Sequence, residues 1–316
     1  MSITPEIESR LALLQEKYEA MGQDMTSYLD GLLHADFLTY WDYIHLDTLL
    51  SLQSPKTPFP DEEIFIMYHQ ITELYFKLAL HECKQIAERE HLTADFFTAR
   101  LKRINSYFEA LIKSFDIMVD GMEKDQFLQF RMSLLPASGF QSGQYRMIEI
   151  YGTDFINLVA KDKREGLRSA PIETQFDDLY WKSGATELST GKKTLTLKQF
   201  EKKYAKTFIE LGKVNAKHNF NALLRQLQYD GASTPALENE LRQFDVNANV
   251  NWPLVHYKSA VRYLNREPDE IKATGGTNWQ KYLPPRFQKL IFYPSLWSEE
   301  QIQDWGKSWV ESVVGK

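Results

Sequence analysis

The chain has 316 residues, of which 43% are hydrophobic and 25% charged. This composition is typical of a globular protein with one large domain or two ordinary ones. A net charge of −6 gives no general attraction to nucleic acid or anionic membranes. The single cysteine, Cys83, excludes an intramolecular disulfide and a cysteine-rich zinc site. With no long apolar run and no signal peptide, we expect a cytoplasmic protein in a reducing compartment.

Helical periodicity dominates the chain, and we find neither an alternating strand pattern nor an internal repeat. Apolar residues recur at helical spacing in residues 5–21, 37–53, 62–88, 92–120, 125–135, 196–229, 235–245 and 251–265. Asp61 is expected to cap the helix that follows the proline-containing loop 54–63. The sequence therefore predicts an all-α protein with one large domain, residues 1–316. Within it, residues 1–35 form an N-terminal helical arm and residues 160–245 a helical excursion.

Two of the seven histidines lie in apolar helical settings. His69 follows Phe65 by four residues in "FIMYHQITELYFK", so both side chains share one side of the helix. His256 lies between Trp252 and Tyr263 in "NWPLVHYKSAVRYLN". An imidazole in such a place is either an axial ligand of haem iron or, more commonly, a core histidine bonded to a backbone carbonyl. The histidine spacing alone leaves both alternatives open.

Arg131 is a cation among apolar neighbours, four residues after Phe127. A buried guanidinium needs an anion, because an unpaired buried charge is very costly. The partner is either one of the protein's own carboxylates or the carboxylate of a ligand. The glycine-containing stretch "TGGT" (274–277) does not follow a predicted strand, and we interpret it as a lid loop rather than a phosphate cradle.

Several sequence blocks together resemble the tryptophan 2,3-dioxygenase family. The blocks are "YWDYIHLDTLLSLQ" (40–53), "DEEIFIMYHQITELYFK" (61–77), "FRMSLLPASGFQSGQYRMIE" (130–149), His256 in its helix, and "ATGGTNWQKYL" (273–283). They occur in the family's order and span most of the chain. The resemblance implies a haem-containing, all-α fold and cleavage of the indole C2–C3 bond of L-tryptophan by O₂, giving N-formylkynurenine.

The resemblance also implies a role for each matching residue. His256 matches the histidine that ligates the iron of haem b, with one haem per subunit, and Ser138 and Gly139 match the loop against the other haem face. His69 matches the distal histidine that accepts a hydrogen bond from the indole N–H. Arg131 matches the arginine that binds the substrate carboxylate, and Thr274 matches the threonine of the closing loop.

Other matching positions complete the substrate pocket. Phe65, Phe127 and Leu134 match residues that surround the substrate within one subunit. Tyr40, Tyr43 and Ile44 match positions that complete the pocket of a neighbouring subunit in the family's homotetramer. An aromatic wall, an acceptor, a guanidinium and a hydroxyl are what a site for an indole-bearing amino acid requires.

The chain departs from the family pattern in four places. Phe127 stands where a tyrosine is common, Trp41 replaces a small residue, and Tyr75 replaces a tryptophan. After "TGGT", the residues "NWQKYL" differ from the family's small ones. These departures leave two alternatives, a monooxygenase of the same superfamily acting on tryptophan or a substituted tryptophan, and a non-catalytic haem-binding sensor.

Overall fold

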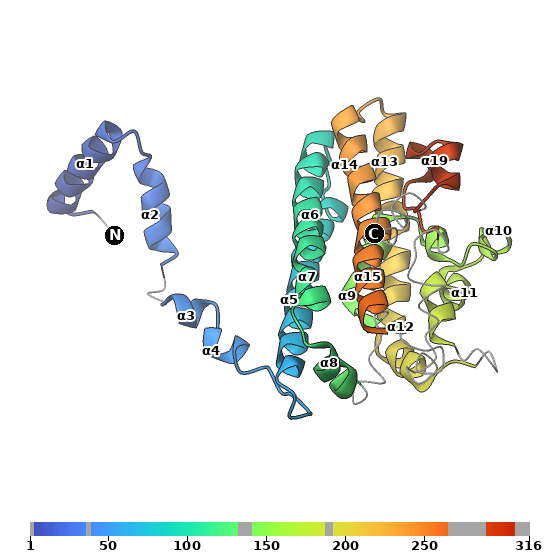
Figure 1. The fold of residues 1–316 in the computed structure, drawn as a ribbon. Coiled ribbons are helices and arrows are strands. Elements are labelled where there is room, and N and C mark those ends of the chain that lie inside the picture. Colours follow the sequence, from blue (N-terminus) through green and yellow to red (C-terminus); the bar gives the residue numbers. More distant parts are fainter. Residues whose placement is uncertain (1–2, 36–38, 132–140, 187–191, 265–288, 307–316) are drawn as a thin grey trace. The chain divides into compact units, whose positions relative to one another are not determined.

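The computed structural model describes residues 3–35, 39–131, 141–186, 192–264 and 289–306 (Figure 1). Throughout these ranges the regular elements are helices, and β pairing is confined to two isolated bridges, Val159–Leu179 and Thr186–Lys193. The all-α prediction is therefore confirmed for the described chain. Among the described helices, not one combines the length and apolar character needed to cross a membrane.

Contacts divide the chain into two units, Met1–Gln53 and Ser54–Lys316. The first unit holds α1 (Pro5–Ala20), α2 (Met25–Leu33), α3 (Tyr40–Tyr43) and α4 (Leu46–Leu49), and no residue of these helices is buried. The prediction of one helix over 37–53 is wrong. His45 has a left-handed φ of 51°, which ends the first short helix and separates it from the second.

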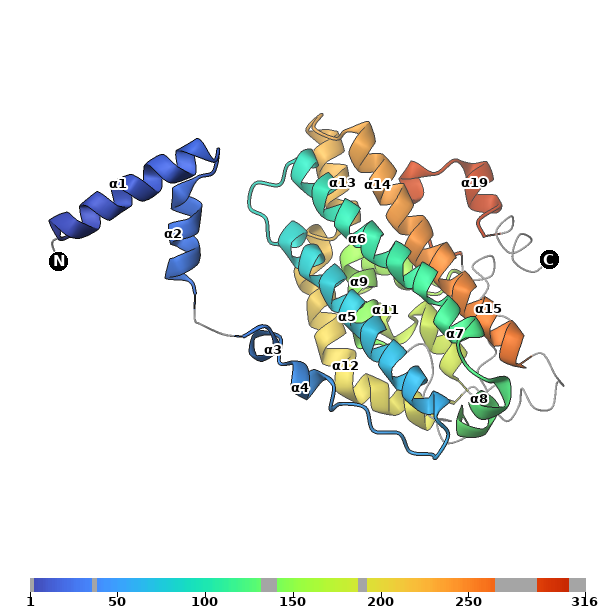
Figure 2. The ribbon, with the colours of Figure 1, turned by 60° about the vertical axis from the view of Figure 1, so that its left-hand side comes forward.

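The main helices of the second unit pack in an order that differs from their order in the sequence. They are α5 (Asp61–Ala87), α6 (Ala94–Ser114), α7 (Asp116–Asp120), α8 (Lys124–Phe130), α9 (Gly143–Gly152), α12 (Leu195–Val214), α13 (Phe220–Tyr229), α14 (Pro235–Val246) and α15 (Trp252–Leu264). Helix α14 packs on α6, α6 on α5, α5 on α9, and α9 on α12 (Figure 2). Shorter helices, α10 (Arg164–Leu167), α11 (Ile172–Asp177) and α19 (Glu299–Gln303), also belong to this unit.

Helices α14 and α15 are joined by a π turn, Asn247–Asn251, into one continuous helical run (Figure 2). The sequence predicted two separate helices at 235–245 and 251–265. The sequence predicted a single helix over 196–229, but the structure has two helices there. Helix α12 ends before Asn215, and α13 begins at Phe220.

Aromatic side chains link the long helices in the core. Phe76 of α5 lies 6.1 Å from Phe108 of α6, measured between ring centroids, and Phe108 lies 5.7 Å from Phe244 of α14. Phe220 of α13 lies 6.1 Å from Phe244. These rings are almost fully buried, and paired aromatic rings add to the stability that burial of their area already provides.

The start of α5 is held by two carboxylates. Glu62 accepts hydrogen bonds from the backbone N–H groups of Lys56 and Thr57, at 2.9 and 2.7 Å, and so ties down the proline-containing loop. The prediction that Asp61 caps the helix is wrong. Asp61 is its first residue, and its carboxylate accepts from the backbone N–H of Glu123, 2.6 Å away, which secures the turn before α8.

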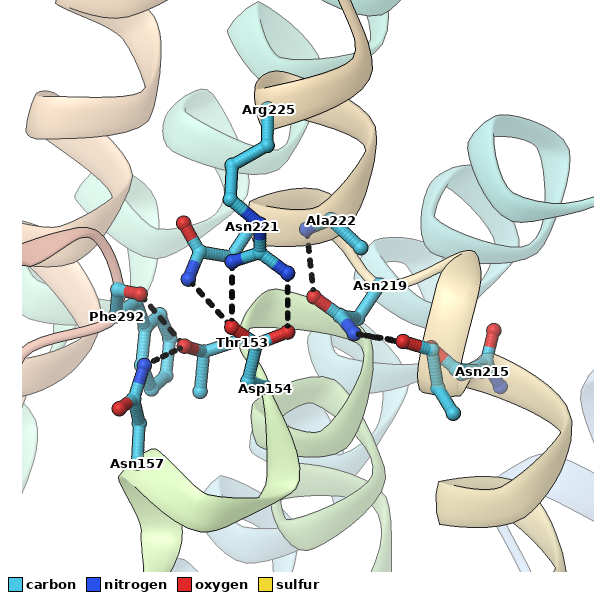
Figure 3. Close-up of polar contacts among 10 residues, drawn as sticks. Thr153, Asp154, Asn157, Asn215, Asn219, Asn221, Ala222, Arg225 and Phe292 are labelled. Atoms are coloured by element: carbon cyan, nitrogen blue, oxygen red, sulfur yellow. Dashed lines mark hydrogen bonds and ion pairs between the residues drawn. The ribbon is translucent and has the colours of Figure 1, made fainter. Parts of the chain in front are cut away.

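A polar joint connects the end of α9 to α13 (Figure 3). The Asp154 carboxylate accepts from both terminal nitrogens of Arg225, at 2.6 and 3.0 Å, and from Asn221 at 2.9 Å. The Thr153 hydroxyl donates to the backbone carbonyl of Phe292, 2.6 Å away. These polar groups are hydrogen-bonded to one another, so we interpret the joint as a structural connection between helices.

A cavity of about 180 Å³ lies beside this joint, and Gly212 of α12 lines it. A Cβ added to Gly212 would lie 2.7 Å from the Phe155 ring. We predict that Gly212→Ala lowers the free energy of unfolding by about 1–3 kcal/mol, because the ring must move from a packed position. Urea unfolding followed by circular dichroism measures this change.

Gly166→Ala is the matched control, because a Cβ at Gly166 meets nothing within 4 Å. Its free energy of unfolding should equal or slightly exceed that of the parent chain. If the two variants were equally stable, the close approach of Phe155 to Gly212 would not be a constraint.

Candidate active site

His69 lies in the third turn of α5, against Phe65 one turn earlier. Their ring centroids are 4.1 Å apart, and His69 Nδ1 lies 2.7 Å from the Phe65 carbonyl oxygen. A carbonyl oxygen only accepts, so Nδ1 carries the proton of the neutral ring and Nε2 carries the lone pair.

The His69 ring is partly desolvated by neighbouring protein. Its side chain keeps an exposed surface, yet desolvation by the surrounding protein lowers its pKa. The Phe65 carbonyl and the negative charge of Glu73 oppose this shift without cancelling it.

His256 lies in the second turn of α15 with the same local geometry. Its Nδ1 lies 2.9 Å from the Trp252 carbonyl oxygen, so its Nε2 also carries a lone pair. The ring centroids of Trp252 and Phe115 are 4.3 and 4.4 Å away. Burial is the main cause that lowers the pKa of His256 to about 4, and His69 makes a smaller contribution in the same direction.

An aromatic wall runs from α5 through α8 to α15. Phe127 lies 6.4 Å from Phe65 and 4.4 Å from Tyr263, measured between ring centroids. The Arg131 guanidinium lies 6.0 Å from the Phe127 ring centroid. Arg131 is half-buried, so its charge lies partly in water.

The structure thus brings together five of the residues singled out in the sequence. Phe65 and His69 come from α5, Phe127 and Arg131 from α8 and its end, and His256 from α15. Four others lie outside the described residues, namely Leu134, Ser138, Gly139 and Thr274. The remaining three, Tyr40, Tyr43 and Ile44, belong to the first unit, where Tyr40 and Tyr43 are 70% and 73% exposed.

Sequence reasoning missed the residues that connect the two histidines. Tyr68 lies 6.2 Å from His69 and 5.7 Å from Phe115, which in turn contacts His256. Phe115 stands where α6 ends and α7 begins, and its neighbours in the chain give no signal of a site. Only the packing of three helices brings these rings side by side.

This arrangement fits a haem better than a bare metal ion. Within the described ranges, no group of three or more His, Cys, Asp or Glu side chains is placed to hold a metal. Haem needs one imidazole with a lone pair and aromatic or aliphatic walls. His256 supplies the first, and Phe115 and Trp252 are apolar walls beside it. The hydrogen bond from Nδ1 to a carbonyl is the usual second interaction of a metal-bound histidine.

Residues 32–161 match the family described as tryptophan 2,3-dioxygenase. A tryptophan 2,3-dioxygenase of Ruegeria sp. (strain TM1040) is 44% identical over 117 residues, which cover 36% of this chain and 41% of the relative. One of Anaeromyxobacter sp. (strain K) is 40% identical over 121 residues, covering 38% and 45%. One of Bacillus anthracis is 42% identical over 124 residues, covering 37% and 43%.

The matched segment spans less than half the length of these relatives. The resemblance to the family is confirmed over this range. The range includes Phe65, His69, Phe127 and Arg131, and it ends before His256.

The depressed pKa of His256 makes stability depend on pH. Between its ordinary value of 6.5 and about 4, the unfolded chain binds a proton at this ring and the folded chain does not. Acidification therefore favours unfolding. Relative to His256→Leu, the haem-free parent chain should lose about 2 kcal/mol of stability between about pH 7 and about pH 4.5. Urea titrations at both pH values measure the difference, and a constant difference would contradict burial of a neutral ring.

Proposed function

We propose that this chain is a haem-dependent dioxygenase that cleaves the indole C2–C3 bond of L-tryptophan with O₂ and releases N-formylkynurenine. The observation that carries the proposal is the pair of neutral imidazoles, His69 of α5 and His256 of α15, linked by the rings of Tyr68 and Phe115. The match of residues 32–161, which include His69, to the family described as tryptophan 2,3-dioxygenase supports it.

In this proposal His256 holds haem b through Nε2. Desolvation keeps the ring neutral at physiological pH, so the lone pair is available without competition from a proton. The bound haem supplies the oxygen chemistry, and the protein supplies binding and orientation. We place Ser138 and Gly139 against the haem face opposite His256, as in the family.

The substrate's parts match the side chains around His69. The Phe65 and Phe127 rings offer flat apolar surface to the indole, and we assign Leu134 to the same wall. Arg131, half-buried at the end of α8, binds the substrate carboxylate by a charge-assisted pair. Thr274 contacts the amino and carboxylate groups. Orientation of this kind is worth several kcal/mol in a two-reactant step.

We assign His69 the role of hydrogen-bond acceptor for the indole N–H rather than that of a base. Its proton on Nδ1 is directed to the Phe65 carbonyl, and Nε2 carries the lone pair. Desolvation by neighbouring protein lowers the pKa of His69, which weakens it as a base and leaves the Nε2 lone pair available to accept.

We propose further that the chain works as a homotetramer in which Tyr40, Tyr43 and Ile44 complete the site of a neighbouring subunit. Two observations support this. The helices of the first unit bury none of their residues. Helix α5 also exposes a stripe of large apolar side chains at helical spacing, namely Met67, Ile71, Leu74 and Leu78.

A cytoplasmic location accords with the buried free thiol of Cys83.

Arg131→Ala should weaken L-tryptophan binding by about 2–3 kcal/mol, because the substrate carboxylate loses its charged partner. Substrate titration of the haem-loaded chain, followed by haem absorption, measures this loss. Arg168→Ala is the control, since Arg168 is exposed and pairs with exposed Glu165. Equal affinity in Arg131→Ala and the parent chain would remove Arg131 from the substrate site.

The mass of the product tests the function itself. The haem-loaded, reduced chain is mixed with L-tryptophan under isotopically labelled O₂, and we expect two labelled atoms in one ring-opened product. His256→Ala should lose haem and give no product. One labelled atom would indicate a monooxygenase, and bound haem without product would indicate a sensor or another substrate.

A further inference from the structure

The helix that carries His256 is preceded by an irregular turn. In the π turn Asn247–Asn251, the backbone N–H of Trp252 donates to the carbonyl of Asn247, five residues earlier instead of four. One added residue rotates the following helix by about 100° relative to the preceding one. The direction in which the His256 ring points therefore depends on this turn.

The turn leaves the Ala248 carbonyl without its usual helical donors. In an α-helix the donor would be the Trp252 N–H, which bonds to Asn247 instead. In a continued π pattern the donor would be residue 253, which is proline and has no N–H. Ala248 is fully buried, so water cannot replace the missing donor.

The hydroxyl of Tyr145 supplies that donor. Its oxygen lies 2.8 Å from the Ala248 carbonyl oxygen, in the buried interior. Burial raises the pKa of this phenol well above its ordinary value, so the hydroxyl keeps its proton and remains a donor. Tyr145 is a member of the "SGQYR" block at the start of α9, about a hundred residues away from the turn in the sequence.

Tyr145 is itself held in place from three sides. Its backbone N–H donates to the side chain of Ser142, the N-cap of α9. The Arg146 guanidinium lies 4.9 Å from its ring centroid. Phe76 lies 5.3 Å from the Tyr145 ring and 5.7 Å from Trp252, whose carbonyl accepts the His256 Nδ1–H. The hydroxyl is thus presented to the π turn by a rigid surrounding.

We propose that Tyr145 is a positioning residue for His256. By donating to the Ala248 carbonyl it holds the π turn and so sets the rotation of α15 that directs His256 Nε2 into the site. The inference rests on the proposed function only where it concerns haem.

The side chains within the run should keep the variant folded. Asn251 and Gln243 donate to the Asn247 side-chain oxygen, at 3.0 and 3.1 Å, and Asn249 donates to Asp245 at 2.7 Å. These bonds are independent of Tyr145. Loss of its hydroxyl should therefore loosen the turn without unfolding the protein.

Tyr145→Phe is the test variant, because it removes the hydroxyl and keeps the ring. Tyr151→Phe is the matched control. Tyr151 lies on the same helix, is also buried, and directs its hydroxyl to the Asn215 side chain instead of the π turn. Hydrogen–deuterium exchange on the haem-free full chain measures how well the backbone amides of the turn are protected.

We expect amides in residues 248–256 to exchange about tenfold faster in Tyr145→Phe than in the parent chain or Tyr151→Phe. In the haem-loaded chain, Tyr145→Phe should also release haem about tenfold faster to a haem-scavenging protein and show a changed absorption spectrum. Adding Pro253→Ala should reduce both effects, because alanine restores a backbone N–H next to the Ala248 carbonyl.

Equal exchange in the three chains would overturn the inference. So would faster exchange in Tyr145→Phe combined with an unchanged haem spectrum and release rate, because the turn would then not position His256. If the parent chain bound no haem, the proposed function would fail. The exchange experiment would still decide separately whether Tyr145 holds the turn.

Discussion

The site depends on two imidazoles that the surrounding protein keeps without charge. Desolvation lowers the pKa of both His69 and His256, so each ring is neutral and carries one proton. In both, that proton on Nδ1 is directed to the carbonyl four residues earlier in the same helix. Each ring is therefore fixed relative to its own helix. The rotation of α5 and of α15 about their axes determines what each Nε2 lone pair faces.

Buried charges on α9 and α14 are paired within the second unit. Arg146 and Glu149 of α9 pair at 2.7 Å while both are nearly inaccessible to water. Asp245 of α14 accepts from the backbone N–H groups of Phe292 and Tyr293, and from two side chains. Burial nevertheless raises the pKa of Asp245 to about 6, because desolvation outweighs the donors. Such networks specify one packing when every member has a partner.

The second unit contains a well-packed core, but the first does not. Residues 1–53 form helices whose large apolar side chains, such as Leu33 and Tyr43, are exposed. Helix α5 carries an exposed apolar stripe of its own, from Met67 to Leu78. Apolar area of this kind is stable in water when another surface covers it. This is the physical reason for proposing an assembly in which subunits complete one another.

The sequence by itself determined the helical class, the extent of α1 and α5, and the placing of Phe65 and His69 on one face, because helical periodicity is a local property. The apolar settings of Arg131 and His256 in the sequence also made them site candidates, to which the resemblance added expected roles. Only the tertiary structure decided that α14 and α15 form one run, since a π turn depends on the donor that Tyr145 brings from α9. It also decided which rings join the two histidines, because contacts such as Tyr68 with Phe115 exist only after distant helices pack.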